Sequence, residues 1–481
     1  MAEPPPPPLS LGSRLAFGVG SAAEAITLGA VTAFAMLYYN QVLGLPAWLA
    51  GLALSGALGL DGLTDPIVGS WSDRTRSRWG RRHPFMFAAP VPIAISFLAI
   101  FNPPAGIGQV GLFLWFAVSV TALRQTMTLF HTPHLALGAE LSSDYTGRSA
   151  VMAWSTMLGW AGGALAYALA LAVFFAPTPA YPSGLLNPAP WSRYSLVMAL
   201  VTMAALFASA WFTKDRIPYL PRPADEAPGF SLRAFLRDAR DALANRNYLW
   251  LLIAYFFLSM TNGLRDGLWI YTTTFYWRLS SQAQAWFILG SLAGYVFSFL
   301  FAARFHRRFD KKAVILASCA AYALGPSVPF LLGLGGVLTP QTPGLLPFLV
   351  AWTFFTHAPI SVLTISVMSA IADIADENEL RHGARQEGVL YSTRAVFAKI
   401  DQAVGAAIAG GVLSLIAFPV HAVPGAVSAG VLERLAVAYA LSGVPAAIAL
   451  VFYARISLSR EAWQAARSAL DARSAASGRR P

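Results

Sequence analysis

The sequence has few charged residues and almost no cysteine. Only 12% of its 481 residues are Asp, Glu, Lys or Arg, whereas 56% are hydrophobic. A soluble domain carries about 25% charged residues, so this composition excludes an ordinary soluble protein and indicates a polytopic membrane protein. The single cysteine, Cys319, excludes an intramolecular disulfide framework. The motifs of zinc metalloproteases, α/β-hydrolases and P-loop nucleotide-binding proteins are also missing, which argues against a membrane enzyme.

The net charge of +11 does not indicate a nucleic-acid partner, because the basic residues gather in a few loops and in the tail. Such clusters are typical of segments that face the anionic inner surface of a membrane, so we expect contacts with membrane lipids. Residues 1–12 hold a proline tract without an apolar core. We therefore expect no cleavable signal and a disordered cytoplasmic leader.

Apolar segments of about 20 residues, the length that crosses a bilayer, recur along the chain. They predict twelve transmembrane helices, at 13–39, 46–72, 84–102, 109–138, 150–175, 194–213, 247–277, 283–305, 312–334, 344–371, 387–418 and 431–456. A charged, proline-rich connection at 214–246 separates the first six from the last six. The sequence thus predicts an all-α integral membrane protein with two six-helix bundles, 13–213 and 247–456, joined by a cytoplasmic linker and followed by a basic cytoplasmic tail at 457–481.

The loops alternate in charge. Those at 39–46, 102–108, 335–343 and 418–431 contain almost no Lys or Arg, whereas the alternate loops and the tail contain nearly all of them. Cytoplasmic loops carry the excess of basic residues. We therefore expect both termini in the cytoplasm and the protein in the cell (inner) membrane.

Two acidic residues lie inside the second predicted helix. Asp61 and Asp65 are four residues apart, so their side chains share one face and can converge on one small ligand. A carboxylate in hydrocarbon costs roughly 3 kcal/mol on insertion scales, which a cation, a proton or a protein partner has to offset. Sodium prefers hard oxygen ligands, and Thr64 can supplement the two carboxylates. The alternative is a structural salt bridge from Asp61 to Arg124 or Lys399.

A longer motif surrounds the acidic pair. It reads Asp61-Gly-Leu-Thr-Asp65-Pro-Ile-Val-Gly-Ser-Trp-Ser-Asp73-Arg74-Thr-Arg-Ser-Arg-Trp-Gly-Arg81-Arg82. This motif closely resembles the signature of the glycoside–pentoside–hexuronide:cation symporters, and the stretch from Ala372 to Lys399 resembles a second segment of that family. The resemblance covers essentially the whole chain. It implies the major facilitator fold and sodium- or proton-driven uptake of a sugar or glycoside by alternating access, with a small-molecule substrate, a coupling cation and no cofactor.

The resemblance also implies roles for single residues. Asp61 and Asp65 match the family's helix-two cation ligands, and Lys399 matches its helix-eleven lysine near the sugar and cation sites. Other positions depart from the family pattern. His131 stands where the family has a helix-four aspartate, and Glu24 lies beside the position of a sugar-binding aspartate. Because imidazole accepts protons near neutral pH but is a poor sodium ligand, His131 favours a proton as the coupling ion.

Two further departures concern the substrate. The sugar-stacking tryptophan of the family falls at about Leu135, and its helix-five arginine falls at Ala153 or Trp154. These changes leave an alternative substrate open, an amphiphile such as a lysolipid, as in animal relatives of the family.

Depth along the helices, at about 1.5 Å per residue, places four charged residues at one level of the membrane. We predict a midplane cluster of these four: Glu24, Asp61, Arg124 and Lys399. Asp65 and His131 are expected one to two turns closer to the cytoplasm. Together with Thr64 and Trp154, these residues are the predicted cation and substrate contacts.

Three other features are candidates for function. Arg265 and Asp266 in the seventh span point about 100° apart, so we expect them to have different partners, in substrate binding or in gating. The loop residues Asp73, Arg74, Arg81 and Arg82 predict a gating loop, in which Asp73 pairs with an arginine or caps a helix.

His131 and His134 have the spacing of metal ligands, but no cysteine or second histidine cluster accompanies them, so we expect no metal site. Glycine patches at 159–163 and 405–411 are expected to allow close helix approach. Nothing in the sequence specifies an oligomeric state.

Overall fold

The structure is a computed structural model that describes residues 9–142, 145–220, 231–382, 387–457 and 468. Its regular elements in these residues are helices, apart from an isolated bridge between Thr178 and Tyr181. The predicted all-α fold is confirmed. Most of the expected leader and tail lies outside the described residues.

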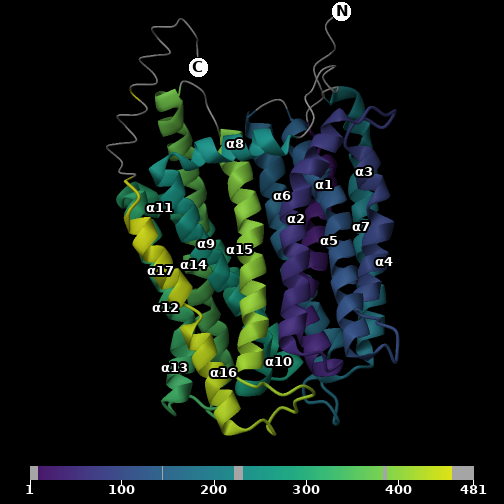
Figure 1. The fold of residues 1–481 in the computed structure, drawn as a ribbon, viewed down its shortest axis with the longest axis vertical. Helices are drawn as coiled ribbons and strands as arrows, with labels where there is room; N and C mark the ends of the chain where they lie inside the picture. Colours follow the sequence, from purple (N-terminus) through teal and green to yellow (C-terminus); the bar gives the residue numbers. More distant parts are fainter. Residues whose placement is uncertain (1–8, 143–144, 221–230, 383–386, 458–467, 469–481) are drawn as a thin grey trace, which may run out of the picture. The chain divides into compact units, whose positions relative to one another are not determined.

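Long helices follow one another along the chain, with shorter helices between them (Figure 1). In the first half they are α1 (Leu11–Ala30), α2 (Ala47–Arg74), α3 (His83–Ala88), α4 (Pro90–Ile100), α5 (Gly108–Glu140), α6 (Tyr145–Leu169) and α7 (Pro190–Phe212). In the second half they are α8 (Leu232–Leu243), α9 (Arg246–Tyr271), α10 (Ser281–Ala285), α11 (Phe287–Arg308), α12 (Lys311–Leu324), α13 (Val328–Leu334), α14 (Leu345–His382), α15 (Glu387–Leu415), α16 (Ala429–Leu441) and α17 (Val444–Ala454).

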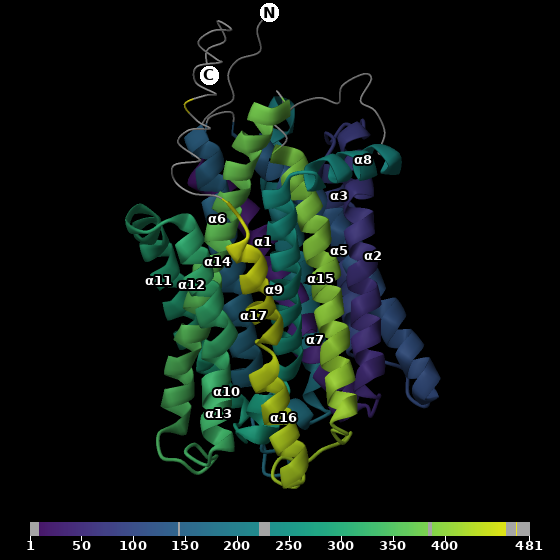
Figure 2. The ribbon, with the colours of Figure 1, turned by 60° about the vertical axis from the view of Figure 1, so that its left-hand side comes forward.

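Proline and π-helical turns interrupt several spans. Pro90 stands at the start of α4 and Pro445 near the start of α17, where a missing backbone N–H ends the preceding helix. α16 and α17 therefore follow one another as one interrupted rod (Figure 2). Five-residue π-helical turns extend α1 at Val31–Ala35 and α6 at Ala170–Phe174.

Eleven helical segments among the described residues are long and apolar enough to cross a membrane. They coincide with the predicted spans, except the one at 247–277. α9 occupies that place and has 26 residues, which suffices for a bilayer at about 1.5 Å per residue. It carries Asn262, Arg265 and Asp266, which lower its hydropathy, so it differs from the other spans in polarity and not in length.

The chain divides into two compact units. Unit 1 comprises Met1–Phe230, Thr273–Ala285 and Ala406–Val427, and unit 2 comprises Ser231–Thr272, Trp286–Gly405 and Ser428–Pro481. Unit 1 therefore holds the first seven helices together with two short segments from the second half of the chain. The boundary falls inside α15, between Gly405 and Ala406.

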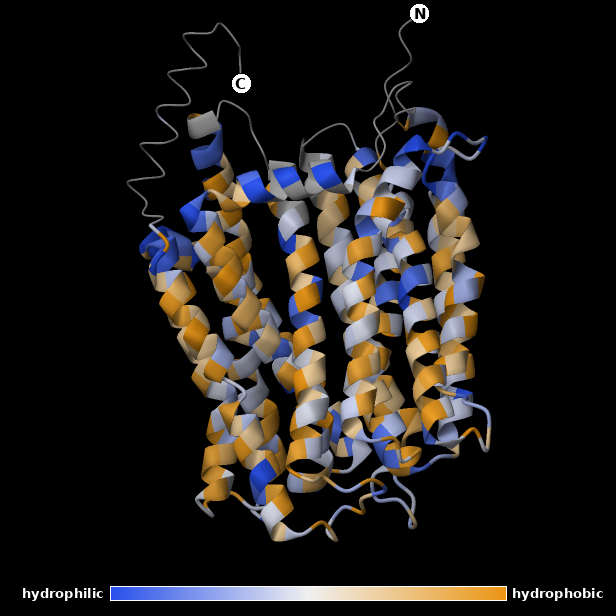
Figure 3. Cartoon of the chain, viewed as in Figure 1, coloured by the Kyte–Doolittle hydropathy of each residue, from blue (hydrophilic) through white to orange (hydrophobic). Residues whose placement is uncertain are grey.

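In unit 1, α1 packs against α6 and α7, α2 packs against α5, and α4 packs against α5 and α7. Hydrophilic residues interrupt the otherwise hydrophobic helices at mid-height around α2 and α5 (Figure 3). The predicted acidic pair, Asp61 and Asp65, belongs to α2.

The segment 406–427 joins unit 1 through a close backbone approach. A Cβ atom on Gly410 would lie 2.4 Å from the carbonyl oxygen of Ala47, so α15 contacts α2 only because glycine has no side chain. Beyond this contact, the Gln41 amide donates to the Pro419 carbonyl at 3.0 Å and accepts from the Ala422 backbone N–H at 2.9 Å. The predicted glycine patch does allow close approach here.

In unit 2, α17 packs against α9 and α12, and α14 packs against α11 and α12. Their shared core includes Tyr248, Leu363, Val367 and Tyr453, all at most 1% exposed. This unit carries Lys399, Arg265 and Asp266.

Candidate functional site

The acidic pair lies at the contact between α2 and α5. The Asp61 carboxylate accepts a hydrogen bond from Arg124 at 3.3 Å and one from the Thr128 hydroxyl at 2.5 Å. The same hydroxyl lies 3.1 Å from a carboxylate oxygen of Asp65. Asp61, Arg124 and Thr128 are all buried, with at most 9% of each exposed. The two carboxylates thus converge on one hydroxyl, as their spacing predicts.

Thr128 takes the position that the sequence assigned to Thr64. The Thr64 hydroxyl donates to backbone carbonyls of its own helix, those of Leu60 at 3.2 Å and Asp61 at 3.3 Å. Thr128 was missed, although one signal was available. It follows Arg124 by four residues and therefore shares its helix face.

A second pair connects α1 with α5. The Nδ1 atom of His131 lies 2.8 Å from the Glu24 carboxylate, and both side chains are partly exposed. The charge of Glu24 also acts on Arg124. The two layers predicted from helix depth are therefore linked into one cluster, in which Glu24 contacts His131 directly.

His134 contacts α1 at a different residue, Phe17. Its Nε2 atom lies 2.9 Å from the Phe17 carbonyl oxygen, and its ring stacks on Phe17 with centroids 4.1 Å apart. The two histidines thus have separate partners.

The remaining predicted contacts are spread over both units. Trp154 is partly buried on α6 in unit 1, and Lys399 is partly buried on α15 in unit 2. Arg265 is buried, and its guanidinium donates to the Ser442 hydroxyl at 2.9 Å and to the carbonyls of Tyr322 at 2.7 Å and Ala323 at 3.0 Å. Asp266 is exposed. The two neighbours therefore point in different directions, as expected.

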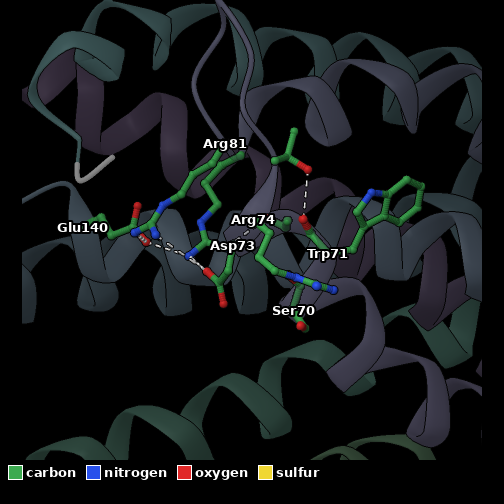
Figure 4. Close-up of polar contacts among 9 residues, drawn as sticks. Ser70, Trp71, Asp73, Arg74, Arg81 and Glu140 are labelled. Carbon is green, nitrogen blue, oxygen red and sulfur yellow. Dashed lines mark hydrogen bonds and ion pairs between the residues drawn. The ribbon is translucent and has the colours of Figure 1, made fainter. Parts of the chain in front are cut away.

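The predicted gating loop follows α2 in unit 1 (Figure 4). Arg82 contacts the Asp73 carboxylate at 2.5 Å and Glu140 at 2.8 Å, and its guanidinium also donates to Ser72 at 2.9 Å. Arg81 lies 2.8 Å from the same Glu140 oxygen and 3.9 Å from Asp73. This ion-pair cluster of Asp73, Arg81, Arg82 and Glu140 joins the end of α2, the loop and the end of α5.

Arg74 stays outside the ion-pair cluster and donates to the Ser70 carbonyl at 3.3 Å. The arginine partners of Asp73 come from its own loop. Glu140, the last residue of α5 and two residues beyond the fourth predicted span, was missed by the sequence analysis.

A family model described as MFS/sugar transport protein matches residues 16–460. The chain is 25% identical over 412 residues to the putative glycoside/cation symporter YagG of Escherichia coli, covering 85% of this chain and 84% of that one. It is 21% identical to the isoprimeverose transporter of Lactiplantibacillus pentosus, covering 92% and 88%. It is 23% identical to the sodium-dependent lysophosphatidylcholine symporter 1 of Gallus gallus, covering 83% and 78%.

Among solved structures, the nucleoside transporter NupG (D323A mutant) superposes with a TM-score of 0.61 at 14% identity, covering 93% of this chain and all of that one. At this identity the likeness concerns the fold alone. The resemblance stated from the motifs is confirmed, and so is the expectation of a multi-pass membrane transporter without enzyme activity. The chain belongs to the MFS/sugar transport protein family and has the major facilitator fold.

Proposed function

We propose that this protein is a symporter that couples the uptake of a sugar or glycoside to a proton or sodium gradient by alternating access. The relatives named as glycoside/cation symporter, isoprimeverose transporter and lactose permease support this substrate class. The convergence of Asp61 and Asp65 on Thr128 carries the proposal.

The charges of the cluster explain why it would bind a cation. Three carboxylates, those of Glu24, Asp61 and Asp65, face one guanidinium and one imidazole. Acidic groups outnumber basic groups among these five. Carboxylate and hydroxyl oxygens are the ligands that hard cations prefer, so this set of groups supports the binding of a mobile cation.

The position of that cation follows from the contacts. Arg124 contacts Asp61 in this structure, and the Thr128 hydroxyl lies between Asp61 and Asp65. We propose Asp61, Asp65 and Thr128 as the cation ligands. Thr64, which the sequence suggested, is not included, because its hydroxyl donates to carbonyls of its own helix. The Glu24–His131 pair favours a proton as the coupling ion, because both groups exchange protons readily.

We propose fewer substrate-binding residues than the sequence suggested. Arg265 uses its guanidinium on a hydroxyl and two carbonyls of its own unit, which supports a structural role. Exposed Asp266 and partly buried Lys399 and Trp154 are better placed to meet a substrate. Glu24 and Arg124 would link substrate and ion, since both belong to the charge cluster.

A lysolipid is the alternative substrate. The relative named as a lysophosphatidylcholine symporter supports it, as does Leu135, which is 52% exposed where the sugar transporters carry a stacking tryptophan. A counterflow assay in proteoliposomes separates the two. Glycosides, pentoses, uronates and lysolipids are tested with and without sodium and with and without a pH gradient. Exchange of a lysolipid and of no sugar would overturn the sugar assignment.

The topology belongs to the same proposal. We place the protein in the inner membrane with both termini in the cytoplasm, two bundles at 13–213 and 247–456, and the ion-pair cluster on the cytoplasmic side as a gate. Cysteines introduced at residue 76 and residue 342 are expected to react with an impermeant maleimide from opposite sides.

A further inference from the structure

A buried acid in unit 2 has no part in the proposed cation site. Asp401 on α15 is 0% exposed, and neither of its carboxylate oxygens has a hydrogen-bond partner among the described residues. Asp61 in unit 1 is also buried, but it is held by a guanidinium and a hydroxyl. The two buried acids therefore differ in how their carboxylates are stabilised.

The surroundings of Asp401 follow from two contacts between α9 and α15. Arg394 donates to the Tyr255 hydroxyl at 2.7 Å, and further along a Cβ atom on Gly263 would lie 2.9 Å from the Cα atom of Gly405. Residue numbers rise on both helices from the first contact to the second, so the helices run in the same direction. Asp401 lies one turn before Gly405 and is therefore level with Ser259, one turn before Gly263.

The close approach at Gly263 and Gly405 explains why Asp401 is shielded from solvent. One turn earlier on α15, Phe397 packs against the apolar core of unit 2. An ionised carboxylate in such a place, without hydrogen-bond donors, is strongly disfavoured, and the group becomes neutral instead. The proton is the cation that a single carboxylate without further ligands can bind, since sodium needs several oxygens.

The positive charge of Arg394, two helical turns away on α15, acts on Asp401. Among the described residues, Arg394 contacts no carboxylate. Its guanidinium lies over the Tyr255 ring at 4.4 Å from the centroid, and its Nε atom has no partner. Arg265 lies on α9, two residues after Gly263. Its guanidinium donates to the carbonyls of Tyr322 and Ala323.

We propose that Asp401 is a proton-binding site of unit 2, whose carboxyl group takes a proton from water and returns it there. Arg394 supplies the positive charge that stabilises the deprotonated form. This site is separate from Asp61 and Asp65, and it does not require that those residues bind the driving ion.

The test is infrared difference spectroscopy on the full-length protein in lipid during a pH titration, which needs no substrate. The wild type is expected to show the C=O stretch of a protonated carboxyl group at neutral pH, and this band is expected to vanish as the pH rises. Asp401→Asn removes the band, and Asp401→Glu restores it at a shifted frequency. Arg394→Gln keeps the band to higher pH, because the compensating charge is gone.

Two control variants separate this site from the proposed function. Asp61→Asn and Asp266→Asn are both expected to retain the band. If Asp61→Asn loses uptake but retains the band, the result affects only the proposed cation site of unit 1 and leaves the Asp401 proposal standing. A wild type without the band, a band that survives Asp401→Asn, or an Arg394→Gln titration identical to the wild type would each overturn the proposal.

Discussion

Selected charged side chains of the two units have different kinds of partner. In unit 1, Asp61 forms an ion pair with Arg124 and Glu24 contacts His131, and both partners lie on another helix, α5. In unit 2, Arg265 is held by carbonyl oxygens, and Asp401 has no hydrogen-bond partner among the described residues. Side-chain pairs can exchange partners when an ion arrives, whereas a guanidinium bound to helix carbonyls is fixed. The cation response that we propose would therefore belong to unit 1, whereas Arg265 of unit 2 is held in place by carbonyl oxygens.

The largest expected effect comes from removing Asp65 of the unit 1 cluster. Asp65→Asn is expected to abolish cation-dependent accumulation of the substrate, because the proposed site loses one of the two carboxylates that converge on Thr128. A coupling free energy of about 1–3 kcal/mol corresponds to roughly 5–150-fold in affinity. The measurement is gradient-driven uptake in proteoliposomes.

Thr64→Val is the matched control, since the Thr64 hydroxyl contacts its own helix backbone, and near-normal uptake is expected. Full accumulation by Asp65→Asn would refute the cation site.

The second largest effect is expected at the ion-pair cluster at the end of α2. Arg82→Ala removes the buried arginine that contacts both Glu140 and Asp73. Arg81 still contacts Glu140, so the cost is expected to stay below the about 3–5 kcal/mol of a broken buried ion pair. Thermal unfolding of the purified protein is expected to shift to lower temperature, with slower uptake. Arg74→Ala serves as the control, because among the described residues Arg74 contacts a carbonyl in its own turn and stays outside the cluster. Equal shifts in the two variants would contradict the role given to Arg82.

In unit 2, Arg265→Gln tests whether the guanidinium is structural. It removes charged hydrogen bonds to two carbonyls, each worth about 1.5–3 kcal/mol, so the unfolding temperature is expected to fall. The neighbouring Asp266→Asn change should leave the unfolding temperature unaltered and alter substrate affinity instead. The reverse pattern, with Arg265→Gln affecting affinity alone, would move Arg265 into the substrate site.

The smallest effect is expected at the glycine contact between α15 and α2. Gly410→Val places atoms against the Ala47 carbonyl, and overpacking of this kind costs about 1–3 kcal/mol. Gly411→Ala, one residue further along, meets nothing within 4 Å and should leave stability unchanged. Thermal unfolding of the two variants side by side measures the difference, and a neutral Gly410→Val would show that the helices can separate at this contact.

Much of the fold followed from the sequence, because hydropathy and loop charge depend on composition over long windows. The acidic pair and the arginine loop were also predictable, since both are local patterns. The sequence also offered Arg124 as a partner of Asp61 and an arginine as a partner of Asp73, and both contacts are present. It did not give the other partners. The position of a residue along its helix gives only its depth. The contacts of Glu24 with His131 and of Arg82 with Glu140 depend in addition on how two helices are rotated about their axes relative to each other. The spacing of residues within one helix does not determine that rotation.

The π-helical turn at Val31–Ala35 has a consequence for the evolution of the chain, because it lies inside a helical run that continues to Val42. Such a turn accommodates one surplus residue inside a helix without shifting the faces on either side. Single-residue insertions and deletions in sequences that derive from this one should therefore collect at this place. Deleting one residue there should yield a straighter helix and a chain that still folds, whereas the same deletion at mid-helix would turn every later side chain away from its neighbour.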